Sequence, residues 1–131
     1  GYTKRLAKAA EEALAEKGYA VRSFDLVEGP ADIAAAMDAD LLLIGSPTIN
    51  RDALKPVWDF VSSLDAVNLS GKRCLVFGSY GWSGEAVPML CKRLSELKLK
   101  VDGEGFRVRF NPSDEDVNAL RARVAALADA V

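Results

Sequence analysis

The sequence contains no histidine among its 131 residues. Histidine is the usual general acid or base near neutral pH, and it completes most Ser–His and Cys–His nucleophile pairs. It is also the commonest protein ligand of transition metals. The absence excludes these forms of catalysis and nearly every transition-metal site, so we expect neither catalytic nor metal-binding residues in this chain.

Cysteine is almost as scarce, with only Cys74 and Cys91 present. Cys74 lies in the apolar run 73–77, and Cys91 falls at helical spacing beside Leu90 and Leu94. A free cysteine in such surroundings packs as a small hydrophobic residue. The pattern favours reduced core thiols in a cytoplasmic protein, with a disulfide or redox pair as the alternative.

The chain also lacks an excess of charge and a long apolar run. Lys and Arg total 17 against 19 Asp and Glu, for a net charge of -2. Without a basic excess, binding to nucleic acid or to an anionic membrane is not expected. The longest apolar runs, such as 41–44, are far shorter than the ~20 residues that cross a bilayer. Half the residues are hydrophobic, and the length suits one domain, residues 1–131.

What the sequence does contain is an alternation of helical and strand patterns. Apolar residues at helical spacing, or helix-starting residues, predict helices over about 3–17, 30–37, 56–64, 85–97 and from 114 onward. Continuous or alternating apolar runs predict strands over 19–26, 40–45, 72–78 and 106–110. This order is typical of an α/β three-layer sandwich with a parallel sheet and helices on both faces. Because the array begins with a helix, we expect the first strand to be missing from this chain.

Two strand-to-helix loops are unusual, 46–51 and 79–85. Loops of this kind lie at the carboxyl ends of parallel strands, where such sheets bind ligands, so the two should converge. The first offers hydroxyls and a carboxamide, and the second offers glycines with Tyr80 and Trp82. Their combination suits a flat, heteroaromatic, hydrogen-bonding ligand. Thr3 begins the first helix, where exposed N–H groups favour an anion, whereas Trp58 lies on an apolar helix stripe and is predicted to be core.

At these residues the sequence resembles the FMN-binding, flavodoxin-like domain of flavodiiron proteins, also called A-type flavoproteins. The matching runs are 39–50 (ADLLLIGSPTIN), 77–85 (FGSYGWSGE) and 1–4 (GYTK), the last similar to the end of a phosphate loop. The resemblance implies that Thr3 contacts the FMN phosphate. It implies that the ribityl chain and ring are lined by the first loop, with Ser46, Pro47, Thr48, Ile49 and Asn50 as FMN-binding residues. It implies that the isoalloxazine is enclosed by Ser79, Tyr80, Gly81, Trp82, Ser83 and Gly84.

The function implied by this resemblance is electron transfer through FMN. The chain would be the C-terminal part of a flavodiiron-type oxygen or nitric oxide reductase. Electrons would arrive from a rubredoxin or a flavin reductase and pass to a diiron centre in a separate metallo-β-lactamase-like domain, within a homodimer. The chain itself would be an electron-transfer module.

Two alternatives stay open on the residues alone. A flavodoxin-like NAD(P)H:quinone reductase would share the FMN site, although it usually adds a histidine or tyrosine pair that this sequence lacks. A cofactor-free scaffold or interaction domain would keep the loops without the flavin. A phosphoacceptor signalling domain is disfavoured, because the strand end where it needs an aspartate reads Ile44-Gly45-Ser46.

Overall fold

The computed structural model describes residues 2–131, in which ten elements follow one another. The helices are α1 (Tyr2–Glu16), α2 (Ile33–Asp38), α3 (Lys55–Ser62), α4 (Ala66–Leu69), α5 (Ala86–Glu96) and α6 (Asp114–Ala130). The strands are β1 (Leu41–Gly45), β2 (Arg73–Tyr80), β3 (Lys100–Val101) and β4 (Phe106–Arg109). Within the described part of the chain, no helix combines the length and the apolar character that crossing a membrane requires.

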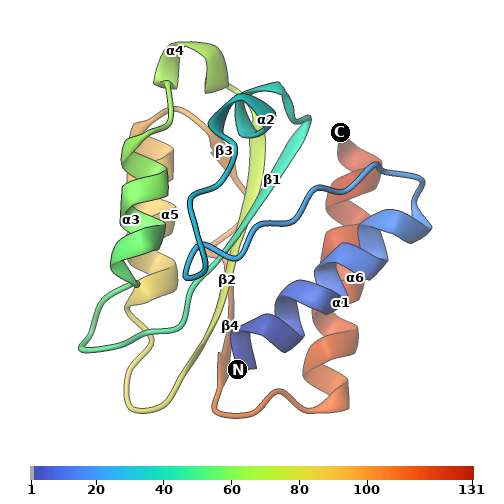
Figure 1. Ribbon diagram of the computed structural model, residues 1–131. Helices are drawn as coiled ribbons and strands as arrows, with labels where there is room; N and C mark the ends of the chain where they lie inside the picture. Colours follow the sequence, from blue (N-terminus) through green and yellow to red (C-terminus); the bar gives the residue numbers. More distant parts are fainter. Residues whose placement is uncertain (1) are drawn as a thin grey trace.

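The elements form three layers, with a parallel sheet between two pairs of helices (Figure 1). β2 is the central strand and pairs with β1 along one side. On its other side it pairs first with β3 and then with β4. Helices α3 and α5 cover one face of the sheet, and α1 and α6 cover the other. The predicted α/β sandwich with a parallel sheet is confirmed.

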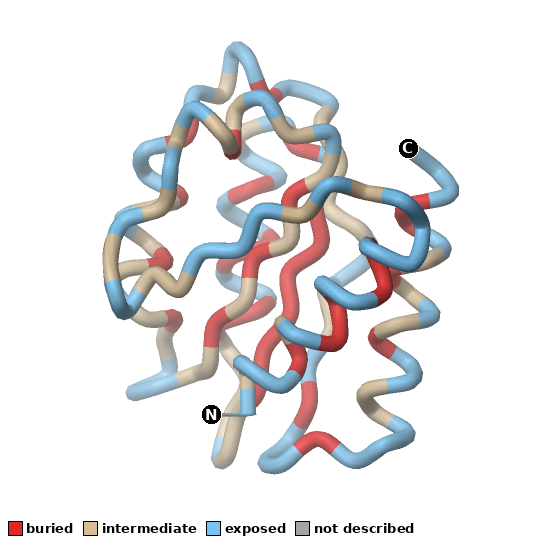
Figure 2. Tube along the Cα trace, turned by 45° about the vertical axis from the view of Figure 1, so that its right-hand side comes forward, coloured by how far each residue is buried: buried red, intermediate tan, exposed pale blue. Residues whose placement is uncertain are grey.

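The core is divided by β2, which is buried on both faces (Figure 2). Cys74 and Val76 pack on the α3/α5 side, while Leu75 and Phe77 pack on the α1/α6 side. Side chains of a strand alternate between faces, so a strand covered by helices on both sides needs a continuous apolar run. That requirement explains why the pattern at 72–78 predicted this strand correctly.

The predicted strand over 19–26 is wrong. The segment is extended, but among residues 2–131 it pairs with no strand. Tyr19 and Val21 nevertheless pack against the α1/α6 core, while Arg22 and Ser23 are exposed. The apolar pattern therefore reflected real burial, but a strand also needs a hydrogen-bonded neighbour, and β1 bonds only to β2 among the described residues.

Several element boundaries differ from the expectations, and the short elements α4 and β3 were not predicted. Two boundary differences are larger or bear on the loops. α2 begins at Ile33 rather than near Pro30, because the Asp32 carboxylate accepts a hydrogen bond from the Ala35 amide and caps the helix there. β2 continues two residues past its predicted end, so Ser79 and Tyr80 belong to the strand. The predicted start of α6 is confirmed, since Ser113 and Asp116 form a reciprocal capping box.

Candidate functional site

The loop that follows β1 is hydrogen-bonded to the end of β2 and to the start of α5, which are the two ends of the second loop. The Ser46 amide donates to the Phe77 carbonyl at 3.1 Å, and the Thr48 amide donates to the Ser79 carbonyl at 3.1 Å. The Thr48 hydroxyl also accepts a hydrogen bond from the Ala86 amide at 3.1 Å, at the start of α5. The predicted convergence of the two loops is confirmed, and both lie at the lower end of the sheet in Figure 1.

Glycine at position 78 is required by this close approach. A Cβ atom on Gly78 would lie 2.0 Å from the carbonyl oxygen of Ser46. Ser46 is itself fully buried. Its hydroxyl donates to the Pro47 carbonyl at 2.8 Å and accepts from the Leu54 amide at 3.1 Å. The Ser46 side chain therefore shapes the first loop from inside.

The outer part of the first loop is a tight two-residue turn. Ile49 and Asp52 exchange backbone hydrogen bonds of 2.9 and 3.0 Å. Between them Asn50 and Arg51 have φ angles of 51° and 62°, a left-handed conformation that asparagine tolerates better than arginine. Asp52, which the sequence did not single out, anchors the turn by accepting a 2.7 Å hydrogen bond from the indole nitrogen of Trp58.

Thr3 approaches the same end of the sheet from α1. Its hydroxyl lies 2.8 Å from the hydroxyl of Ser79. α1 has 15 residues, and its first amides carry the partial positive charge of a helix N-terminus. The structure thus brings the hydroxyls of Thr3 and Ser79 together at the start of α1. Gly1, the first residue of the run 1–4 that resembles a phosphate loop, lies outside the described residues.

Lys4, next to Thr3, is held by Asp25. The two groups form an ion pair of 3.1 Å between α1 and the extended segment. The hydrogen bond that Lys4 donates to Asp25 raises the pKa of Lys4 and lowers the pKa of Asp25. The ion pair thus lies one residue from Thr3.

The two aromatic side chains of the second loop, Tyr80 and Trp82, differ in how far they are buried. Tyr80, at the end of β2, is half-buried, with the guanidinium of Arg107 6.0 Å from its ring centre. Trp82 is 98% exposed. Trp58, which was predicted to be core, is partly buried against the α3/α5 core.

Two arginines of β4 contact this loop, and sequence reasoning missed them. Arg107 donates to the Gly84 carbonyl at 3.1 Å, and Arg109 donates to the Gly81 carbonyl at 3.3 Å. The alternation Phe106-Arg107-Val108-Arg109 indicated that both arginines share one strand face. Only the pairing of β4 with the end of β2 places that face beside the loop.

Glu85 is a further missed residue. One of its carboxylate oxygens is buried and has no hydrogen-bond partner among the described residues. A buried polar atom of this kind is rare and normally has a partner. Glu85 is the last residue of the second loop, just before Ala86, whose amide donates a hydrogen bond to the Thr48 hydroxyl.

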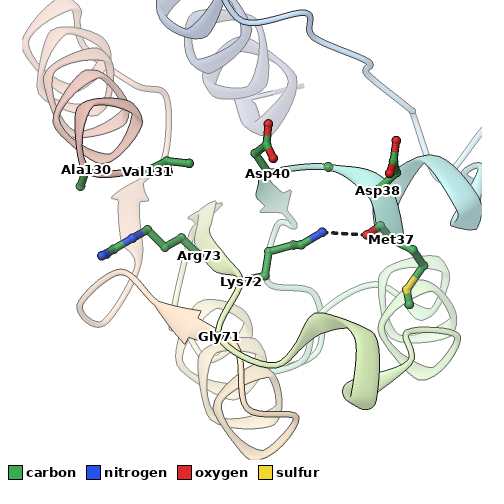
Figure 3. Close-up of a pocket in the computed structure, with 9 residues that line it drawn as sticks. Met37, Asp38, Asp40, Gly71, Lys72, Arg73, Ala130 and Val131 are labelled. Carbon is green, nitrogen blue, oxygen red and sulfur yellow. Dashed lines mark hydrogen bonds between the residues drawn. The ribbon is translucent and has the colours of Figure 1, made fainter.

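Two cavities lie away from the loops. One of about 490 Å³ is at the amino ends of β1 and β2, where Lys72 donates to the Met37 carbonyl at 2.7 Å (Figure 3). The other, of about 350 Å³, lies between α5 and the turn before β4. None of the predicted site residues lines either cavity.

No group of three or more histidine, cysteine, aspartate or glutamate side chains within residues 2–131 is arranged to hold a metal ion. Both cysteines are free and buried. Burial raises the pKa of the Cys74 thiol to about 12 and also raises the pKa of Cys91.

This fold belongs to the α/β class with a parallel sheet, in which ligands commonly bind beyond the carboxyl ends of the strands. The family model for flavodoxin matches residues 1–122, so the chain belongs to the flavodoxin family.

Its similarity extends to flavodiiron proteins and type A flavoproteins. The chain is 51% identical over 78 residues to the flavo-diiron protein FprA2 of Clostridium acetobutylicum, covering 60% of this chain and 20% of that protein. It is 39% identical over 134 residues to the type A flavoprotein fprA of Rhodobacter capsulatus, covering 98% of this chain and 30% of that protein. It therefore spans less than a third of the length of these curated relatives.

A solved structure of a flavodoxin from the domain Archaea superposes with a TM-score of 0.89 and 26% sequence identity. This match covers 99% of the present chain and 90% of the archaeal one. The same fold thus occurs in free-standing flavodoxins and in the flavodoxin part of larger flavoproteins.

Proposed function

We propose that this chain binds FMN at the carboxyl ends of β1 and β2 and transfers electrons through it. The observation that carries the proposal is the junction of Thr3, Thr48 and Ser79, where three separate segments meet through hydrogen bonds of 2.8 and 3.1 Å. Membership of the flavodoxin family supports FMN as the ligand. Bound FMN would supply the ability to accept and release one or two electrons.

The residues present fit the three chemical parts of FMN. The start of α1 offers Thr3 and helix amides, which suit a phosphate. The first loop offers Pro47, Thr48 and Asn50 for the ribityl chain and one ring edge. The second loop offers Tyr80 and Trp82 to cover an aromatic ring, and the orphaned Glu85 oxygen is an acceptor for a ligand N–H or O–H group.

The other predicted residues take supporting places in this site. Ser46 acts through its buried hydroxyl, which fixes the backbone of the first loop. Ser79 would share the phosphate end with Thr3. Ile49 would cover the ring from the loop tip, where it is 53% exposed. Gly81, Ser83 and Gly84 would offer backbone groups to the isoalloxazine, because glycine allows close backbone approach.

The similarity to flavodiiron proteins supports a place for this domain in a larger oxidoreductase. In that setting the chain would receive electrons from a donor such as a rubredoxin or a flavin reductase. It would pass them to a diiron centre that reduces oxygen or nitric oxide, within a homodimer in the cytoplasm. The division of labour leaves electron carriage to this chain and the reduction of oxygen or nitric oxide to the iron site.

The proposal is tested by loading the protein with FMN, adding an NADH-dependent flavin reductase and following flavin absorbance by stopped flow. We expect reduction of the bound flavin, followed by slow reoxidation in air that yields hydrogen peroxide, detected with catalase. Rapid reoxidation without peroxide would place full oxygen reduction in this chain and contradict the proposed division. A protein that takes up no FMN would instead favour the cofactor-free scaffold. NADPH-driven quinone turnover by the loaded protein alone would favour a quinone reductase.

A further inference from the structure

The second loop is contacted at two glycines, Gly81 and Gly84, by side chains of the strands β2 and β4 and of Phe110, which follows β4. At Gly81, the carbonyl accepts a 3.3 Å hydrogen bond from Arg109, and the ring of Phe110 lies 3.4 Å from where a Cβ would stand. At Gly84, the carbonyl accepts a 3.1 Å hydrogen bond from Arg107, and the ring of Tyr80 lies 3.0 Å from the equivalent position. Each glycine therefore meets one arginine and one aromatic ring.

The arginines and the rings also hold each other. The Arg107 guanidinium lies 6.0 Å from the centre of the Tyr80 ring, and the Arg109 guanidinium lies 5.2 Å from that of Phe110. These distances are within the range of cation–π attraction. Planar guanidinium groups suit this double task, because one face stacks on a ring while the edge donates hydrogen bonds.

The pairing of β4 with β2 places Arg107 and Arg109 beside the second loop. Tyr80 pairs with Arg109 at the end of the β2–β4 ladder, and the Phe110 amide extends it by donating to the Tyr80 carbonyl at 2.7 Å. Phe110 then takes a φ of 58°, a conformation unusual for a bulky residue. Such a conformation persists only where surrounding contacts hold it. Phe110 directly follows Arg109, whose guanidinium lies against the Phe110 ring.

Between the two fixed glycines only Trp82 and Ser83 are left, and Trp82 is 98% exposed. We propose that Arg107 and Arg109 are positioning residues that clamp Gly84 and Gly81, and so present the short Trp82–Ser83 arch in a fixed conformation for the flavin. Without the clamp, the glycine-rich loop would be ordered only on binding, and part of the binding free energy would be lost to that ordering. The rigidity of the loop does not depend on the proposed FMN site, whereas the expected effect on FMN affinity rests on that proposed function.

The experiment compares Arg107→Met, Arg109→Met and the double variant with Arg93→Met. Arg93 is an exposed arginine of α5 whose side chain forms no hydrogen bond or ion pair with residues 2–131. Two readouts are taken: ¹⁵N order parameters of residues 81–84 in the FMN-free protein, and the FMN dissociation constant from quenching of flavin fluorescence. Thermal melts confirm that every variant is folded.

We expect the order parameters of the loop to fall from values typical of rigid backbone towards flexible ones, partly in each single variant and further in the double variant. FMN affinity should weaken about three- to ten-fold in each single variant, because the released part of the loop must then be ordered on binding. The loss should persist at high salt, which would remove a long-range charge effect. Unchanged order parameters in the double variant would overturn the clamp. A loss of affinity that disappears at high salt would overturn it as well.

The two readouts separate this proposal from the proposed function. If the unmodified protein binds no FMN, the proposed function fails. The order parameters alone then decide whether the clamp exists.

Discussion

Gly78 of β2 and Ser46 of the first loop are in backbone contact, so that a Cβ on Gly78 would stand 2.0 Å from the Ser46 carbonyl oxygen. The contact lies between the hydrogen bonds that Ser46 and Thr48 donate to Phe77 and Ser79. The absence of a side chain at position 78 therefore lets the first loop pack directly against β2.

Replacing Gly78 with alanine should push the first loop away from β2. Because the obstructing atom belongs to the backbone, it cannot rotate away, and overpacking of this kind costs about 1–3 kcal/mol of unfolding free energy. Urea denaturation measures the change. Gly29→Ala is the matched control, since nothing lies within 4 Å of its Cβ position. Equal stability of the two variants would contradict this account of the contact.

The two tryptophans should respond to alanine substitution in opposite ways. Trp82 is 98% exposed, so Trp82→Ala should leave the unfolding free energy nearly unchanged. It should weaken FMN binding about ten-fold, as loss of a stacked aromatic ring predicts. Trp58→Ala should cost about 2–4 kcal/mol of stability, because it removes core packing and the hydrogen bond to Asp52. A large stability loss in Trp82→Ala with unchanged FMN affinity would contradict the assignment of Trp82 to the FMN site.

The two thiols should be inert in the folded protein. Burial raises the pKa of Cys74 from 9.0 to about 12, so the native state favours the neutral thiol. The thiol's contribution to stability is therefore complete below pH 9, the unfolded value, and is lost as the pH rises towards 12. Urea denaturation at increasing pH should show this loss, and Cys74→Ala should reduce the slope. Rapid reaction of the native protein with a thiol reagent at neutral pH would contradict the burial of both cysteines.

β1 has a hydrogen-bonded neighbour on one side only among residues 2–131. Its other edge presents unpaired amides and carbonyls, and such an edge recruits a further strand. We therefore expect the 131-residue chain to be marginally stable alone or to associate in a concentration-dependent way. Sedimentation across a range of concentrations tests this. A monomer at every concentration, with cooperative melting at high temperature, would contradict it.

The sequence predicted the parts of the fold that depend on local patterns. The continuous apolar run at 72–78 specified a strand covered on both faces, and Ser113 with Asp116 specified a helix start. The segment 19–26 shows the limit. Its alternating pattern correctly indicated that Tyr19 and Val21 are partly buried. A strand also needs a neighbouring strand to pair with, and a local pattern does not show whether one is present.

The candidate site was predictable to the same extent. The convergence of the two loops followed from strand order, whereas the place of Thr3 in the same site was implied by the resemblance to the FMN domain of flavodiiron proteins. The arginines of β4 were not predicted, because they contact the loop only through the pairing of β4 with β2, across more than 20 residues of sequence. The burial of the Glu85 oxygen likewise depends on packing in the folded chain and cannot be predicted from a residue pattern.

The central claim, that FMN binds with its phosphate at Thr3, is tested most directly by titrating the protein and its Thr3→Val variant with FMN and with riboflavin. Riboflavin lacks the phosphate, so the account predicts tighter binding of FMN by the unmodified protein. It predicts that Thr3→Val loses about ten-fold or more in FMN affinity, as removal of a hydrogen bond to a charged group would cause, with little change for riboflavin. Equal affinities for both ligands, or an equal loss for both in the variant, would contradict it.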